Sequence, residues 1–281
     1  MIEKKTLEQF AEIYGREKIE QLEASLAAEQ AKVAALVAAK KFTISTSKTS
    51  HLKFALMSDL HFGSLYYNAP ALEAFYNVLL KRGVRELFMS GDLVEGHSMY
   101  AGQAFEVQEL GLDAQLTAFE NDCPHADEIS VKFVTGNHDE SYKKRMGANV
   151  GKMITRIRSD WEFLGPHQAI HKFKTPDGDY SLMLQHPGGG SAYALSYRPQ
   201  KIVESLMGGQ KPNMIAIGHF HKAEFLPSYR NVSVIQSGTF QKQTPFMLGK
   251  GLQAHLGGWI VEVEVGKQHN QIKAEFIAFY H

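Results

Sequence analysis

The sequence predicts an α/β fold, and three observations indicate it. Short runs rich in Phe, Val, Ile, Leu and Met recur after residue 50, and nearly continuous apolar runs are typical of strands that are buried on both faces. Stretches with a helical pattern separate several of these runs, as expected where helices cover a sheet. Most of the runs lead directly into a polar loop, which is where an α/β fold carries its functional groups.

The composition is that of an ordinary globular protein. The chain has 281 residues, of which 44% are hydrophobic and 21% charged, which excludes a wholly disordered or collagen-like chain. The 30 Lys and Arg residues balance 30 Asp and Glu residues, so no overall basic field indicates a nucleic acid or a membrane. Cys123 is the only cysteine, which excludes a disulfide-bonded secreted scaffold. The polar N-terminus is unlike a signal peptide, and we expect a cytoplasmic protein with no membrane association.

Residues 1–41 are expected to be helical. Their apolar residues recur 3, 4 or 7 positions apart on one helical face, and no Pro or Gly follows Gly15 in this segment. The pattern favours an amphipathic helix that packs on its own domain, and a short self-associating coiled coil is the alternative. Residues 43–50 are polar and β-branched, and are either a linker or a first edge strand. We therefore divide the chain into an N-terminal helical extension and linker, 1–48, and a main domain, 49–281.

The remaining elements follow from apolar patterning. Six apolar runs predict strands at 52–57, 85–89, 129–134, 180–184, 213–217 and 231–235. Helical patterns lie between some of them, at 69–81 and 107–119. Two last strands, 259–265 and 271–280, are joined by the turn Gly-Lys-Gln-His-Asn and predict a hairpin.

Polar side chains follow five of these strands, at the point where each strand ends. Ligand sites of open α/β sheets lie at the carboxyl ends of the strands, so we expect these side chains to converge. The neighbouring glycines Gly91, Gly136 and Gly218 allow the backbone to turn sharply there. The expected set is Asp59, His61, Asp92, Asn137, His186, His219 and His221.

The chemistry of this set indicates a metal site. Two carboxylates, one amide oxygen and four imidazoles, with no thiolate, suit Mn, Fe, Zn, Ni or Mg. Seven ligands are too many for one four-coordinate zinc ion and suit two ions that share a carboxylate. Two-metal sites of this kind clamp the attacking and leaving oxygens of phosphoryl displacement. A single D-x-H or H-x-H motif would more often be polar surface, but the order of all five clusters favours the metal site.

The clusters D-x-H, G-D, G-N-H-D, H and G-H-x-H, in this order over residues 52–240, resemble the calcineurin-like metallophosphoesterases. The resemblance implies two packed mixed β-sheets flanked by helices for the main domain. It implies two divalent metal ions, with Mn²⁺ favoured. It also implies that one ion is held by Asp59, His61 and His221, the other by Asn137, His186 and His219, with Asp92 as the bridge.

His138 has a different role by the same resemblance, because it would protonate the leaving group or stabilise the phosphate. Histidine is the side chain whose ordinary pKa lies nearest neutrality, which suits proton transfer to a leaving alkoxide. A carboxylate usually orients such a histidine. Glu95 and Asp139 are the two candidates for this role, and the sequence does not choose between them.

The second cluster favours one branch of the family. Phosphoprotein phosphatases carry an arginine after the acidic residue, which would bind a phosphomonoester dianion bidentately, and here Gly96 follows Glu95. Residues 59–64 and 91–96 resemble instead the nuclease and phosphodiesterase branch, which includes the exonuclease subunits of archaeal D-family DNA polymerases.

These observations favour hydrolysis of phosphodiester bonds, with DNA or another nucleic acid as the substrate. Lys143 and Arg145 are candidate contacts to a phosphate backbone, and Tyr100 is a candidate platform for a base. The alternative for these three residues is an ordinary solvated surface, which the balanced net charge favours. Two other functions remain open: a phosphomonoesterase that acts on a small molecule or a phosphoprotein, and a non-catalytic scaffold that is recruited through the N-terminal helix.

Overall fold

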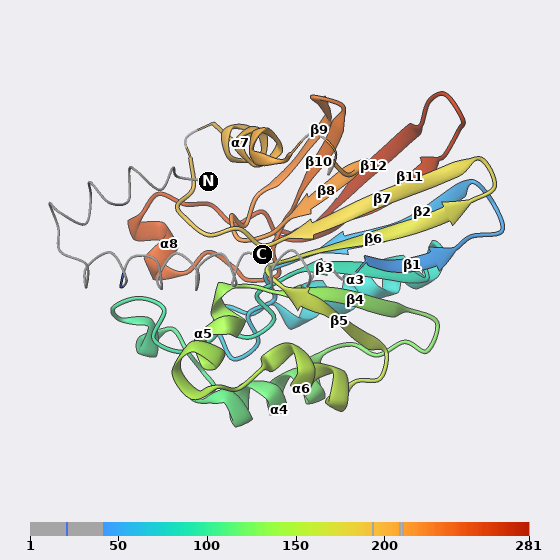
Figure 1. Ribbon diagram of the computed structural model, residues 1–281. Coiled ribbons are helices and arrows are strands. Elements are labelled where there is room, and N and C mark those ends of the chain that lie inside the picture. The colour runs from blue at the N-terminus through green and yellow to red at the C-terminus, as the bar shows by residue number, and fades with distance from the viewer. Residues whose placement is uncertain (1–20, 22–41, 193, 208, 210, 281) are drawn as a thin grey trace, which may run out of the picture. The chain divides into compact units, whose positions relative to one another are not determined.

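A computed structural model describes residues 21, 42–192, 194–207, 209 and 211–280. The chain divides into two units, Met1–Lys41 and Phe42–His281. The helix expected over 1–41, and self-association through it, lie outside the described residues apart from Gln21. The second unit contains two six-stranded mixed sheets with helices against them, which confirms the predicted fold class (Figure 1).

The first sheet, sheet I, carries three of the strands that lead to predicted ligands. Strands β2, β3, β4 and β5 are parallel neighbours, and β11 and β12 extend the sheet as an antiparallel hairpin. The spatial order is β12(Gln271–Ala278), β11(Gly257–Glu264), β2(His51–Met57), β3(Glu86–Ser90), β4(Ser130–Thr135) and β5(Trp161–Pro166).

Sheet II carries the other two ligand-bearing strands, β7 and β8, which are parallel to each other. Its order is β1(Phe42–Thr46), β6(Gln168–Thr175), β7(Gly178–Gln185), β8(Met214–Ile217), β10(Val232–Ser237) and β9(Ala223–Tyr229). β1 pairs in parallel with β6, so the edge-strand interpretation of the segment after residue 42 is the one that the structure shows.

The longer helices lie on the outer faces of the two sheets. Figure 1 shows α4, α5 and α6 on the outer side of sheet I and α7 on that of sheet II. Their bounds are α3(Ala69–Lys81), α4(Leu112–Asp122), α5(Asn137–Met146), α6(Val150–Ile157), α7(Tyr197–Ser205) and α8(Pro245–Gly249), with a short 3₁₀ helix, η1(Gln103–Phe105). None of the helices in the described part of the chain is long and apolar enough to cross a membrane.

Three apolar clusters correspond to the contacts between the layers. One joins sheet I to α3 and its neighbouring helices around Phe75 and Phe133, and a second fills the space between the sheets around Phe54 and Leu182. The third joins sheet II to α7 around Val203. The near-continuous apolar strands are therefore buried on both faces, as their composition predicts. This four-layer packing leaves the carboxyl ends of the central strands as the place for polar groups.

Most predicted elements are present, and the differences are the start of one helix and three additional strands. All eight predicted strands occur, and α3 has the predicted bounds because Asn68 caps its first turn through Ala71 N–H and Pro70 lies in that turn. α4 begins at Leu112 rather than at residue 107, directly after Gly111, whose φ is +89°. The strands β5, β6 and β9 are additional to the prediction.

Candidate metal centre

The loops after the five ligand-bearing strands are joined by backbone hydrogen bonds. Asp59 N–H donates to Gly91 O over 2.9 Å, which links the loops after β2 and β3. Gly218 N–H donates to Gln185 O over 3.0 Å, which links the ends of β8 and β7. His167, in the β5–β6 turn, donates to Thr135 O and accepts from His186 N–H, so it connects the two sheets. The strand ends of both sheets therefore meet at one place, as predicted.

Several of the candidate ligands have left-handed backbone geometry, which is uncommon for residues other than glycine. Such residues cost free energy and cluster at functional sites, where the surrounding fold holds them in place. The φ angles lie between 54° and 79° at Asp59, His61, Asp92, His219 and His221.

Glycine is required beside these residues because there is no space for a side chain. A Cβ atom at Gly136 would lie 2.1 Å from Asp92 Oδ1. Gly91 combines a φ of +94° with a position where a Cβ would lie 2.5 Å from His186 Nδ1. The two glycines let the loops after β3 and β4 pack directly on the ring of His186 and the carboxylate of Asp92.

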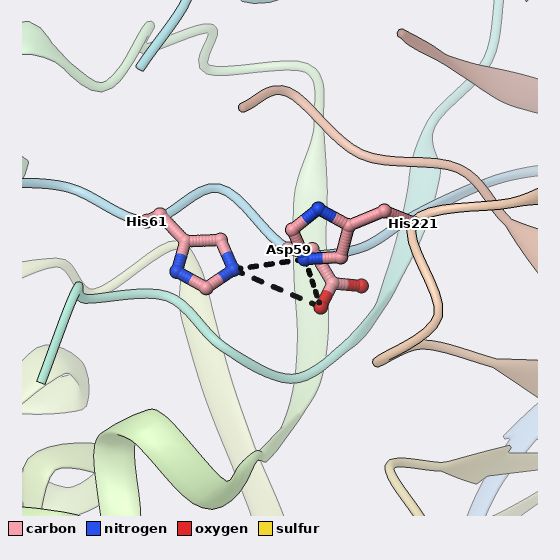
Figure 2. Close-up of side chains that lie close together, drawn as sticks. All are labelled: Asp59, His61 and His221. Carbon is pink, nitrogen blue, oxygen red and sulfur yellow. Dashed lines mark hydrogen bonds and ion pairs between the residues drawn. The ribbon is translucent and has the colours of Figure 1, made fainter. Parts of the chain in front are cut away.

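The first group of ligands consists of Asp59, His61 and His221 (Figure 2). The Nε2 atoms of the two histidines are 3.2 Å apart, and Asp59 Oδ1 lies 3.3 Å from His221 Nε2 and 3.9 Å from His61 Nε2. Asp59 is fully buried, and both of its oxygens also accept from His219 N–H. Burial acts to raise the pKa of Asp59, but His221 and His61 outweigh this effect and hold that pKa well below its usual range.

The second group consists of Asp92, His186 and His219, and Asn137 contacts it. His186 Nε2 lies 3.0 Å from Asp92 Oδ2 and 3.0 Å from Asn137 Oδ1. His219 is oriented by the bond that its Nε2–H donates to Gly189 O over 2.6 Å. Six of the predicted ligands therefore lie in two groups of three, and Asn137 completes the set of seven.

The second group fits a divalent cation by the chemistry of its donor atoms. His186 Nδ1 donates to Ser90 O over 2.7 Å, so in neutral His186 the lone pair of Nε2 faces two oxygen acceptors. Such a contact needs either a second proton on His186 or a cation between His186 Nε2, Asp92 Oδ2 and Asn137 Oδ1. Burial lowers the pKa of His186, but the charge of Asp92 dominates and raises it to about 9. Buried imidazoles of this kind, oriented through the other ring nitrogen by a carbonyl, are typical of metal ligands.

Glu95 contacts both His61 and His138, through different atoms. Its carboxylate lies 3.1 Å from His61 Nδ1, whereas its backbone carbonyl accepts from His138 Nδ1 over 2.5 Å. The carboxylate also accepts from Gln103 Nε2 and Gln241 Nε2, each over 2.9 Å. The carbonyl group of Glu95, and not its carboxylate, is therefore the group that orients His138. These three titratable residues form a further group with metal-ligand spacing, His61, Glu95 and His138.

Asp139, the other candidate partner of His138, has a structural position. Its Oδ2 accepts from Gly136 N–H over 2.8 Å and its Oδ1 accepts from Leu93 and Val94 N–H over 3.0 Å. Burial and the neighbouring charge of Asp92 raise the pKa of Asp139 to about 7. Asp139 thus ties the N-terminus of α5 to the loop after β3, and both of its carboxylate oxygens are used in these bonds.

A cavity of about 540 Å³ opens onto the ligands, and it receives one of the three predicted substrate contacts. Tyr100 lines it, together with His61, Asp92, Asn137, His138, His219 and His221. Lys143 and Arg145 do not line it: Lys143 pairs with Glu140 over 3.5 Å, and Arg145 donates to Ser98 O over 3.0 Å. Both cations lie on the last turn of α5.

Several lining or supporting residues were not predicted from the sequence, among them Gln103, Gln241, Phe246 and Lys250. The two glutamines bind the Glu95 carboxylate, and Phe246 and Lys250 lie on the cavity. Gln241 and Phe246 follow β10 in the chain, where no motif marks them. Only their contacts with distant residues reveal them.

Comparisons with known proteins bear on this site. The family described as calcineurin-like phosphoesterase matches residues 52–223. The DNA polymerase II small subunit of Halobacterium salinarum is 25% identical over 249 residues, which cover 74% of this chain and 47% of that protein. The subunit of the same name from Methanocaldococcus jannaschii is 25% identical over 246 residues, which cover 70% and 40%. The chain therefore spans less than half the length of these relatives.

Among solved structures, wild-type Vps29 complexed with zinc from Entamoeba histolytica superposes with a TM-score of 0.40 and 12% identity. The superposition covers 80% of this chain and 99% of that one. The GAP50 anchor of the inner membrane complex of Plasmodium superposes with a TM-score of 0.48 and 11% identity, over 81% and 84% of the two chains.

Proposed function

The chain belongs to the calcineurin-like phosphoesterase family, and from this premise we propose that it hydrolyses phosphodiester bonds at a centre of two divalent cations. The observation that carries the proposal is the pair of ligand groups, Asp59–His61–His221 and Asp92–His186–His219. Each group contributes two members to the lining of one cavity, which also includes His138. Asn137 completes the second group, and we assign the bridging role to Asp92. Mn²⁺ is the favoured ion, and Fe, Zn, Ni or Mg suits the same donors.

The cations and His138 have separate roles in the proposed hydrolysis. The cations, when bound, supply positive charge for the phosphoryl oxygens and lower the pKa of a bound water. His138, whose ring is oriented by Glu95 O and lies on the cavity, is the proposed proton donor to the leaving oxygen. Burial lowers the pKa of His138 from its ordinary value, and Asp92, with its Oδ2 4.0 Å from His138 Nε2, opposes this effect.

The charges on the cavity favour a diester over a monoester. Among the described residues that line it, Lys250 is the one lysine or arginine, beside the carboxylates of Asp92 and Glu95. A phosphomonoester dianion is usually met by an arginine fork, whereas a diester carries a single charge. DNA is the favoured substrate because the curated relatives are named as subunits of a DNA polymerase.

The names of these relatives support a second feature, a protein partner. Both are small subunits, and we propose that this chain also assembles with a larger protein. A subunit can be purely structural, so a non-catalytic scaffold is the competing function. Because every proposed ligand is present in both groups, we favour an enzyme over a non-catalytic scaffold.

Turnover of bis-p-nitrophenyl phosphate and of p-nitrophenyl phosphate in Mn²⁺ tests the proposal. We expect the diester to be preferred, and Asp92→Asn to lower its turnover about 100-fold or more together with bound manganese. Asp179→Asn is the matched control, because Asp179 is exposed near the start of β7, away from His186 at its other end. Equal activity and equal metal content of wild type and Asp92→Asn would reject the enzyme, and preference for the monoester would reject the diester substrate.

A further inference from the structure

The cavity has an apolar part that the proposed hydrolysis does not use. Beyond the candidate ligands, its lining includes Met99, Tyr100, Phe246, Met247 and Leu252. The rings of Tyr100 and Phe246 stack, with centroids 4.2 Å apart and planes 22° apart. We call this pair the aromatic wall. Hydrolysis of a phosphate ester requires no apolar surface, so the aromatic wall indicates a second recognition element within the same cavity.

Glu106 holds the two halves of the aromatic wall together. Its Oε2 accepts from Tyr100 OH over 2.9 Å, and its Oε1 accepts from Phe246 N–H over 3.0 Å. The residue is buried, with 8% of its surface exposed, so both bonds form away from bulk water. One carboxylate thus fixes the loop before η1 against the start of α8, which is far away in the chain. The aromatic wall is held in place before any ligand binds, which lowers the ordering cost of binding.

The size and charge of the cavity limit what the aromatic wall can contact. A volume of about 540 Å³ suits a ligand the size of a nucleotide. A duplex would need many cationic contacts to its backbone, and Lys250 alone among the described lining residues is a lysine or arginine. Stacked aromatic side chains beside a phosphate site are instead a platform for a base, whatever its identity.

Building on the proposed function, we propose that the aromatic wall of Tyr100 and Phe246 binds the base of an unpaired nucleotide whose phosphate lies at the candidate metal centre. Glu106 acts as its positioning residue. The recognised chemistry is a phosphate ester that carries an unpaired base, and both a free nucleotide and the end of a single strand present it.

Calorimetric binding to the manganese-loaded full chain tests this proposal with two ligands that differ only by the base. Thymidine 5′-monophosphate should bind roughly 5- to 150-fold more tightly than 2-deoxyribose 5-phosphate, the range expected for stacking of one base. Tyr100→Leu and Phe246→Leu should each reduce this ratio, and Glu106→Ala should reduce it partly, because both hydrogen bonds that hold the aromatic wall are then lost. Equal affinity of the two ligands for the wild type, or an unchanged ratio in both leucine variants, would overturn the proposal.

Phe105→Leu is the matched control, because Phe105 lies on η1 beside the aromatic wall but is 87% exposed and does not line the cavity. It should keep the wild-type ratio. Displacement of bound thymidine 5′-monophosphate by single-stranded oligothymidylate supports a strand end as the source of the base. Retention of the mononucleotide in the presence of the oligonucleotide supports a free nucleotide.

Diester hydrolysis by the same preparations separates this proposal from the proposed function. A protein that cleaves bis-p-nitrophenyl phosphate but binds both ligands equally rejects the aromatic wall alone. An inactive protein that still prefers the ligand with a base rejects the hydrolysis alone.

Discussion

The carboxylate of Glu95 lies 3.1 Å from Nδ1 of His61 in the interior of the protein, with 1% of each residue exposed. A carboxylate at this ring nitrogen fixes the imidazole so that its Nε2 faces Asp59 and His221. Burial acts to raise the pKa of Glu95, but its contact with His61 and the charge of that residue lower it on balance. One residue therefore orients a candidate metal ligand through its side chain and the candidate acid, His138, through its backbone.

This relationship predicts the effect of Glu95→Gln. In the new amide only Oε1 can accept a hydrogen bond, because Nε2 is a donor. The side chain therefore cannot keep all of its contacts with Gln103, Gln241 and His61. We expect affinity for manganese to fall about 10- to 100-fold, the usual effect of removing such an outer partner. Metal titration by calorimetry measures it, with the exposed Glu128→Gln as the control. Wild-type metal affinity in Glu95→Gln would contradict the assignment.

His138→Ala separates metal binding from proton transfer. The variant should keep its bound metal, because His138 belongs to neither of the two proposed ligand groups and only to the further group with His61 and Glu95. It should lose about 100- to 10,000-fold in turnover. His97→Ala is the control, since its ring lies near Tyr142 in the same region, outside the cavity lining. Elemental analysis alongside kinetics gives both readouts. Parallel loss of metal and activity would show that His138 is a ligand and not the proton donor.

Gly136→Ala tests the close packing of the loops. The new methyl group would lie 2.1 Å from Asp92 Oδ1 and 2.7 Å from Asp92 N, so the carboxylate must move. We expect loss of bound metal and a destabilisation of about 1–3 kcal/mol in urea unfolding. Gly249→Ala, at a position with no atom within 4 Å of the added Cβ, should change neither quantity. Full metal binding by Gly136→Ala would show that the loop after β4 can shift to accommodate the methyl group without displacing the Asp92 carboxylate.

The sequence allowed the ligand-bearing strands to be predicted because burial on both faces produces continuous apolar runs. β6 escaped prediction because Lys172 and Lys174 interrupt its apolar residues, while its buried His171 looks polar in the sequence. β9 is only partly buried and contains Pro227, so its pattern is weak. An apolar run marks most clearly a strand whose two faces are both covered.

The convergence of the candidate ligands was predictable for a similar reason, since each lies in a loop that follows a recognisable strand. The orientation of His138 was not, because it depends on the backbone path through Glu95 and not on residue type. The aromatic wall depends on Glu106 joining Tyr100 to Phe246 across two loops that no local pattern connects. Contacts between distant loops are the part of the site that composition and spacing leave open.

The buried His171 predicts how stability depends on pH. Its Nδ1 lies 2.7 Å from Thr43 Oγ1 and its Nε2 lies 3.0 Å from Ser45 Oγ, so it links β6 to the edge strand β1. Burial, aided by Lys132, lowers the pKa of His171 to about 4, whereas the unfolded chain has a histidine pKa of about 6.5. Between these values the unfolded state binds a proton that the folded state does not. The contribution of this residue is therefore complete above about pH 6.5 and is lost as the pH falls towards 4.

His171→Gln keeps a donor and an acceptor but cannot titrate in this range. Urea unfolding at about pH 4.5 and pH 7.5 should show that the loss of stability on acidification is smaller in this variant by about 2–3 kcal/mol. The exposed His269→Gln should keep the wild-type difference between the two pH values. Because the other titrating groups are common to all three proteins, their effects cancel in this comparison. An equal loss in wild type and His171→Gln would mean that His171 is protonated without cost in the folded protein.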